Sequence, residues 1–272
     1  MLAITTATCS DRGQRAANED ALRVGIAGAS QYAVLSDGAG GHARGAEASR
    51  CVVEHIEAAL QSTTGLSFAP DRLTSILLAA HTELQHWQMD ARGHRRMHAT
   101  VVVLWIDTRS ARAIWSHVGD SRLYRFRSGV ADLVTADDSV VQRMLEVGML
   151  TPQQAQDHPM KNQLLAAVGM QEDVEPHTLA DDAAVEAGDA FLLCTDGWWG
   201  VIRDAEMTGA LGDADTPQAW LDAMRHLIET RRAPGQDNFS AIAVWVADAA
   251  DVADVADAVD SDTTVAMPLS VP

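Results

Sequence analysis

Acidic residues stand beside glycine at the ends of short apolar segments in several separated parts of the chain. Asp37 follows the apolar run Tyr32–Ser36 and precedes Gly38, and Asp196 precedes Gly197 after another apolar run. A strand fixes the direction of the side chain at its end, so this pattern favours a fold in which these strand ends converge. The other members of the set are Glu19, Asp20, Asp120 and Asp237.

Carboxylates in this setting suit a hard divalent cation. Glycine lets backbone carbonyls and waters approach closely, and carboxylates supply the oxygen ligands of the octahedral shell that Mg²⁺ or Mn²⁺ requires. The alternative for any single Asp is that it caps a turn through an Asx hydrogen bond. For one residue the turn is the better interpretation, but for the whole set we predict one metal site.

The apolar pattern predicts an α+β chain in which strands and helices do not strictly alternate. Apolar residues at helical spacing predict helices over 46–60 and 73–87. Thr-Pro pairs start further helices at 151–152 and over 216–231. Because helices come in early and late pairs, a doubly wound α/β fold is not expected. Strands are predicted near 3–8, 22–26, 32–36, 99–106, 113–118, 123–126, 191–195 and 240–246.

The charge balance argues against two classes of partner. The chain has 20 Lys and Arg against 38 Asp and Glu, a net charge of −18. This field repels phosphate backbones and anionic headgroups, so we expect neither nucleic acid nor a membrane as partner. Asp occurs six times from Asp248 to Asp262, and no Lys, Arg or aromatic residue follows Asp248. We therefore predict a catalytic domain over 1–247 and a disordered acidic tail over 248–272.

Cysteine usage and the absence of targeting segments indicate a cytoplasmic protein. Cys9, Cys51 and Cys194 show no C-x-x-C spacing, which argues against a disulfide framework or a thiolate zinc site. We expect them to be buried as small apolar residues. The N-terminus lacks a signal-peptide pattern, and no apolar stretch approaches the roughly 20 residues that cross a bilayer. We expect a monomer in the cytoplasm.

Five segments occur in the order seen in metal-dependent protein phosphatases. Over about residues 3 to 247 the chain resembles the compact bacterial form of the type-2C Ser/Thr phosphatases, the PPM family. Each segment alone is a weak signal, but the ordered set is specific. The segments are Arg15-x-x-Asn-Glu-Asp20, Asp37-Gly-x-Gly-Gly-His42, Trp115-Ser-His-Val-Gly-Asp-Ser-Arg-Leu-Tyr-Arg125, Leu192-Leu-Cys-Thr-Asp-Gly197 and Asp237-Asn-Phe-Ser-Ala.

The resemblance implies a fold and a metal centre. The fold is a four-layer α-β-β-α sandwich, in which helix pairs flank two antiparallel sheets and a flap insertion over about 138–170 borders the site. The centre holds two Mn²⁺ or Mg²⁺ ions at one edge of the sheets. Bacterial members bind a third metal more weakly.

The resemblance also assigns the ligands, all of them oxygen donors. Asp37 matches the residue that bridges both metals, and the carbonyl of Gly38 matches a ligand of one of them. Asp196 and Asp237 match the residues that complete the shell of the other metal. Asp120, together with Asp196, matches the ligands of the third metal.

Four more residues receive roles around these ligands. Glu19 and Asp20 match positions that hold metal-bound water. Arg15 matches the phosphate-binding arginine, whose guanidinium suits bidentate capture of a phosphoryl group. Because Ala39 replaces the Met or His of many relatives, His42 is the nearest candidate to protonate the leaving oxygen. Its alternative role, a turn histidine bonded to the glycine-rich loop, has equal support.

The resemblance therefore implies a protein Ser/Thr phosphatase. Phosphoserine and phosphothreonine would be hydrolysed by a water that bridges two divalent metals. The partners would be phosphoproteins, and the enzyme would oppose a bacterial Ser/Thr kinase.

Two other interpretations remain open. The chain fits a non-catalytic regulatory or scaffold protein on the same fold, although its metal carboxylates favour activity. The segment Gly38-Ala-Gly-Gly-His-Ala43, with Glu57 about 20 residues further on, fits a dinucleotide-binding motif. Asp37 argues against the second interpretation because it stands where a pyrophosphate would approach.

Overall fold

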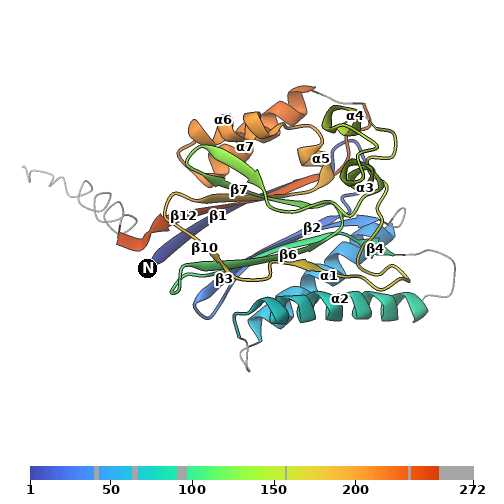
Figure 1. Ribbon diagram of the computed structural model, residues 1–272, viewed down its shortest axis with the longest axis horizontal. Coiled ribbons are helices and arrows are strands. Elements are labelled where there is room, and N and C mark those ends of the chain that lie inside the picture. Colours follow the sequence, from blue (N-terminus) through green and yellow to red (C-terminus); the bar gives the residue numbers. More distant parts are fainter. Residues whose placement is uncertain (40–42, 63–66, 91–96, 157, 232–233, 251–272) are drawn as a thin grey trace, which may run out of the picture.

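Two antiparallel β-sheets lie face to face, and each carries helices on its outer surface (Figure 1). The computed structural model describes residues 1–39, 43–62, 67–90, 97–156, 158–231 and 234–250. The layers follow the order helix, sheet, sheet, helix, so the predicted four-layer α+β sandwich is confirmed.

One sheet pairs the two ends of the domain. Its strand order is β1 (Leu2–Asp11), β12 (Phe239–Asp248), β11 (Ala190–Cys194), β7 (Arg122–Arg127) and β8 (Val130–Leu133). The helices α6 (Asp204–Gly212) and α7 (Pro217–Arg231) cover its outer face (Figure 1). The buried Trp220 of α7 packs edge-on against Phe126 of β7, with ring centroids 5.0 Å apart. This sheet therefore brings sequence-distant strands under one helical layer.

The other sheet holds the N-terminal hairpin at its edge. Its order is β10 (Ala183–Ala184), β6 (Arg112–Val118), β5 (Val101–Asp107), β3 (Ser30–Ala39) and β2 (Asp20–Ala27), with β4 (His98–Ala99) on β3 and β9 (His177–Thr178) on β6. The helices α1 (Ala43–Gln61) and α2 (Pro70–Asp90) cover its outer face. Within the described part of the chain, no helix is both long and apolar enough to span a membrane.

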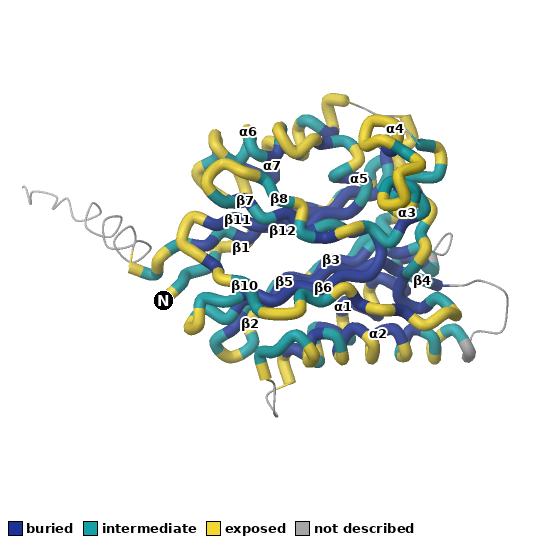
Figure 2. Tube along the Cα trace, in the orientation of Figure 1, coloured by how far each residue is buried: buried dark blue, intermediate teal, exposed yellow. Residues whose placement is uncertain are grey.

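The core consists of three apolar layers, one between the sheets and one under each helix pair. Strand β5 is buried on both faces, because its alternate side chains enter two of these layers. Val101, Val103 and Trp105 pack toward α1 and α2, whereas Val102, Leu104 and Ile106 pack between the sheets. Figure 2 shows this burial along the strands. The predicted burial of all three cysteines is confirmed.

Most predicted elements are present, with moderate shifts in their ends. The helices predicted over 46–60, 73–87 and 216–231 correspond to α1, α2 and α7. The strand predicted over 99–106 is divided into β4 and β5 at Thr100. The prediction missed β8, β9 and β10, because strands of two to four residues show too little alternation to detect. It also missed the helices α3 (Val140–Glu146), α5 (Asp196–Trp199) and α6.

The 138–170 segment lies at one end of the sandwich, beside α5 (Asp196–Trp199) (Figure 1). It contains α3 (Val140–Glu146) and the short α4 (Pro152–Gln156), which starts after Thr151 as predicted. The Ser139 side chain caps α3 by accepting a hydrogen bond from the Gln142 amide over 3.1 Å. A β-bridge between Ala99 and Val168 attaches the end of the segment to β4.

The dinucleotide-binding interpretation is wrong. That fold needs parallel strands joined by crossover helices, and every strand pairing in the described residues is antiparallel. Strand β12 continues to Asp248, and residues 251–272 of the predicted tail lie outside the described residues.

Candidate metal centre

Two of the predicted carboxylates face each other across a strand pair. Asp20 begins β2 and Asp37 lies near the end of β3, and the two are direct partners in the antiparallel register. Side chains opposite each other in such a pair point to the same face, so two like charges are brought close. Burial, and next the charge of Asp20, raise the pKa of Asp37 well above its usual value. This pairing is unfavourable without a compensating cation.

Asp196 joins this pair from the other sheet. It follows Thr195, whose hydroxyl donates to Oδ2 of Asp20 over 3.1 Å and accepts from the Ser240 amide over 3.0 Å. Burial raises the pKa of Asp20 to about 7, and the charges of Asp196 and Asp237 add to the rise. Burial and the Asp237 charge raise the pKa of Asp196 to about 6. Thr195 therefore connects the two sheets at the carboxylate cluster.

Asp120 is the most deeply buried member of the set, at 4% exposure. It follows β6 directly after Gly119, and its carbonyl accepts a hydrogen bond from Nε1 of Trp199 over 3.0 Å. Burial, and then the charge of Asp196, raise the pKa of Asp120 well above its usual value. The described carboxylates thus destabilise one another's charged forms.

Thr100 fixes the backbone of Asp37. Its hydroxyl accepts a hydrogen bond from the Asp37 amide over 3.0 Å and also bonds the hydroxyl of Ser121 over 2.7 Å. Its own amide donates to the Asp37 carbonyl over 2.8 Å. Thr100 was not among the predicted site residues. A polar residue that interrupts the otherwise apolar run between β4 and β5 was the available signal.

Gly38 and Glu19 pack where β3 meets the start of α1. The Gly38 amide donates to the Glu19 carbonyl over 3.1 Å, and the Glu19 amide donates to Oδ1 of Asn238 over 2.8 Å. A Cβ atom at position 38 would overlap the carbonyl oxygen of Gly45. Only glycine therefore permits this close approach of the end of β3 to the first turn of α1.

Arg15 and Asp237 form an ion pair at the entrance. A guanidinium nitrogen of Arg15 donates to Oδ2 of Asp237 over 2.6 Å, and the amide of Asn238 donates to Oδ1 over 2.8 Å. Both carboxylate oxygens of Asp237 thus have partners. The Arg15 side chain is 57% exposed, so it can move without disturbing the core.

These residues line one cavity of about 560 Å³. All predicted site residues line it except Asp20, which lies beside it, and His42, which lies outside the described residues. Asn162 and Leu164 also line it; the resemblance placed their segment at the border of the site, but neither residue was among the predicted site residues. The lining includes Arg15, Glu19, Asp37, Gly38, Thr100, Asp120, Asn162, Leu164, Asp196, Asp237 and Asn238.

The cavity has the donor chemistry of a site for hard divalent cations. Oδ1 of Asp20 and Oδ1 of Asp196 are buried and have no hydrogen-bond partner, which is unfavourable unless a cation or water reaches them. Among the described residues, no group of three or more His, Cys, Asp or Glu is closed enough to hold an ion as it stands. The two unpartnered oxygens and the mutual repulsion nevertheless favour cation binding, with the Arg15–Asp237 pair as a contact to be replaced.

Comparison with known sequences gives one family. The sequence model of the family described as Protein phosphatase 2C matches residues 9–237. The serine/threonine protein phosphatase PstP of Mycobacterium tuberculosis is 31% identical over 253 residues, which are 91% of this chain and 46% of PstP. The chain thus spans about half the length of that relative. Protein phosphatase PhpP of Streptococcus pneumoniae is 30% identical over 221 residues, 78% of this chain and 84% of PhpP.

Comparison with solved structures gives the same fold. The catalytic domain of PstP, solved in complex with two manganese ions, superposes with a TM-score of 0.76 at 27% identity. The match covers 91% of this chain and all of that domain. The similarity therefore extends across both sheets and both helical layers.

Proposed function

Because the chain belongs to the protein phosphatase 2C family, we propose that it is a metal-dependent phosphatase that hydrolyses phosphoserine and phosphothreonine on proteins. The observation that carries the proposal is the group of partly or fully buried carboxylates, Asp20, Asp37, Asp120 and Asp196, with raised pKa values at one end of the sandwich. A cluster of this kind is unfavourable for stability by itself, and divalent cations would make it favourable.

The residues that would hold the metals come from both sheets. Asp37 would bridge two ions and the Gly38 carbonyl would bind one of them, while Asp196 and Asp237 would bind the other. Asp120 with Asp196 would hold a third. When bound, Mn²⁺ or Mg²⁺ would supply an acidified water and Lewis-acid stabilisation of the phosphoryl oxygens. The PstP catalytic domain, solved with two manganese ions, supports Mn²⁺ as the ion to test first.

The remaining residues would position substrate and water. Glu19 and Asp20 would orient water, since Asp20 is held by Thr195 beside Asp37. Arg15 would leave Asp237 and bind the phosphoryl group through two parallel N–H donors. His42 is retained as the candidate proton donor to the leaving Ser or Thr oxygen.

The proposal includes the domain bounds, the partners and the location of the protein. Residues 1–247 form the catalytic domain, and the 138–170 segment forms a flap at the entrance. The protein acts as a monomer in the cytoplasm on phosphoproteins and opposes a Ser/Thr kinase. The net charge of −18 disfavours nucleic acid as a substrate.

The test is hydrolysis of p-nitrophenyl phosphate and of a phosphothreonine peptide. We expect turnover of both with Mn²⁺, none with EDTA, and none in the variant Asp37→Asn. Turnover that survives EDTA, or full activity of that variant, would contradict the mechanism. Metal binding without any turnover would favour the non-catalytic scaffold instead.

A further inference from the structure

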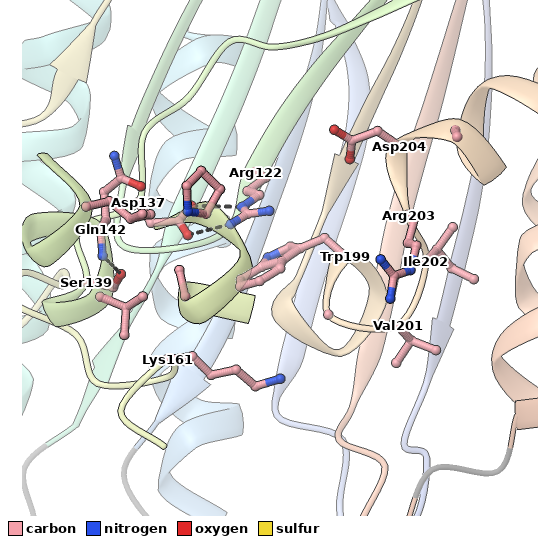
Figure 3. A pocket seen from close by; sticks show the side chains of 16 residues that line it. Arg122, Asp137, Ser139, Gln142, Lys161, Trp199, Val201, Ile202, Arg203 and Asp204 are labelled. Carbon is pink, nitrogen blue, oxygen red and sulfur yellow. Dashed lines mark hydrogen bonds and ion pairs between the residues drawn. The ribbon is translucent and has the colours of Figure 1, made fainter. Parts of the chain in front are cut away.

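A second cavity, of about 530 Å³, adjoins the metal cavity through neighbouring lining residues. Figure 3 shows the side chains that line this second cavity. One wall comes from the 138–170 segment, including Val141, Leu145 and Lys161, and the opposite wall comes from α5, α6 and their connection, including Trp199 and Arg203. None of these residues lines the metal cavity. The cavity is therefore a separate feature of the fold.

The two cavities adjoin at two places. Lys161 lines the second cavity, and the next residue, Asn162, lines the metal cavity. Trp199 lines the second cavity, and its Nε1 bonds the carbonyl of Asp120, which lines the metal cavity. A peptide whose phosphorylated residue enters the metal cavity would therefore have the second cavity beside it.

The second cavity presents cations in a strongly acidic protein. Arg122 is neutralised by Asp137 through two hydrogen bonds of 2.9 and 2.8 Å, and its guanidinium lies 3.6 Å from the Trp199 ring centroid. Lys161 and Arg203 have no ion pair with another described residue. Figure 3 shows their charged ends in the region of Trp199.

The charged residues that line the second cavity have two further features. Lys161 is the only lysine in the sequence, and it lies in this cavity. Asp204 is the other acidic residue of the lining besides Asp137, and in Figure 3 its carboxylate lies on the opposite side of the view from Lys161. The charge of Lys161 opposes the rise in the pKa of Asp196, and the charge of Arg203 contributes to the lowered pKa of Glu206. Since neither cation forms an ion pair with another described residue, both can still bind an anionic group that comes from outside.

We propose that this second cavity binds an acidic side chain of the phosphoprotein substrate, near the phosphorylated Ser or Thr in sequence. Lys161 and Arg203 would donate charge-assisted hydrogen bonds to the carboxylate, and the apolar wall formed by Val141 and Leu145 would contact the side chain's methylene groups. The inference rests on the proposed function, because it selects among substrates of the same metal centre.

The first test is a series of phosphothreonine peptides with one Glu, moved in turn along both sides of the phosphothreonine. Each peptide is compared with its Gln counterpart. We expect kcat/KM to be about three- to tenfold higher for Glu at one position at least. Lys161→Met and Arg203→Gln should remove this preference.

The matched control is Arg143→Gln on α3, because Arg143 is 67% exposed and lies outside the lining of the second cavity. Equal rates at every position, or a preference that both cavity variants retain, would overturn the proposal.

A second measurement does not require turnover. Acetic anhydride acetylates the unprotonated ε-amine of Lys161 and the chain's α-amine with release of acetate, and mass spectrometry measures both rates. In EDTA the preferred Glu peptide should slow labelling of Lys161 more than its Gln counterpart does, while labelling of the α-amino group stays unchanged. Equal protection by the two peptides would overturn the proposal. Failure of all hydrolysis together with selective protection would refute the phosphatase function alone.

Discussion

The guanidinium of Arg15 donates to Oδ2 of Asp237 over 2.6 Å, although 222 positions separate the two residues. Both residues carry roles in the proposed mechanism that exclude this contact, since Arg15 would bind phosphate and Asp237 would bind metal. Arg15 would therefore compete with the metal for Asp237. Loading of the site should release the guanidinium toward the substrate.

Removal of this guanidinium should separate metal binding from substrate binding. We expect Arg15→Ala to lower kcat/KM on p-nitrophenyl phosphate by about tenfold or more, because a charge-assisted contact contributes about 1.5–3 kcal/mol. The Mn²⁺ concentration for half-maximal activity should fall, because a competing cation is gone. Activity measured across Mn²⁺ concentrations gives both values. A variant that needs more Mn²⁺ than the wild type would contradict the competition.

The raised pKa of Asp20 predicts how stability depends on pH without metal. The folded protein releases this proton near pH 7, whereas the unfolded chain releases it near 3.8, so the folded state holds the extra proton between these values. Protonation of Asp20 therefore stabilises the folded state fully below about pH 4, and this stabilisation is lost as the pH rises to 7. Urea unfolding in EDTA should show the wild type losing stability relative to Asp20→Asn between pH 5.5 and 7.5. A difference that stays constant with pH would refute this.

The Thr195 hydroxyl should contribute to stability through both of its partners. Thr195→Val leaves the Ser240 amide and Oδ2 of Asp20 without this bond, and we expect a loss of about 1–3 kcal/mol in the free energy of unfolding. Thr195→Ser keeps the hydroxyl and should lose less than the Val variant. Urea unfolding measures both variants. Equal losses in the free energy of unfolding would show that the Thr195 methyl group, and not its hydroxyl, is responsible.

Gly197 should tolerate no side chain. A Cβ atom there would overlap the carbonyl oxygen of Asn238, so Gly197→Ala should destabilise the fold by about 1–3 kcal/mol and reduce activity by displacing Asp196. The control is Gly209→Ala in α6, where nothing lies within 4 Å of the added atom. That change should stabilise the helix by about 0.5–1 kcal/mol. Thermal unfolding of both variants distinguishes them, and a neutral Gly197→Ala would contradict the close packing.

The main elements and most of the site were predictable because their signals are local. Consecutive apolar residues predict that the strand before Asp37 is buried, and Gly38 after Asp37 indicates that the strand ends there. The same holds for β11 before Asp196. The side chain of a carboxylate at the end of such a strand points in a fixed direction. Which strand ends meet was indicated by the resemblance to the type-2C phosphatases.

The supporting contacts were not predictable because they depend on residues far apart in sequence. Thr195 bonds Asp20 across 175 positions, and no local pattern in either segment indicates the other. The second cavity likewise combines Lys161 with Trp199 and Arg203, whose proximity depends on how the 138–170 segment lies over α5. Short strands such as β9 form only because a partner strand is already in place.

Calorimetric titration with Mn²⁺ tests the metal centre most directly. We expect the wild type to bind at least two ions and Asp37→Asn to lose this binding, since Asp37 would bridge both ions. The matched control is Asp132→Asn on β8, where the carboxylate is 46% exposed and pairs with Arg125, and it should bind Mn²⁺ as the wild type does. A wild type that binds no Mn²⁺, or an Asp37→Asn variant that binds it unchanged, would contradict the assignment of these carboxylates as metal ligands.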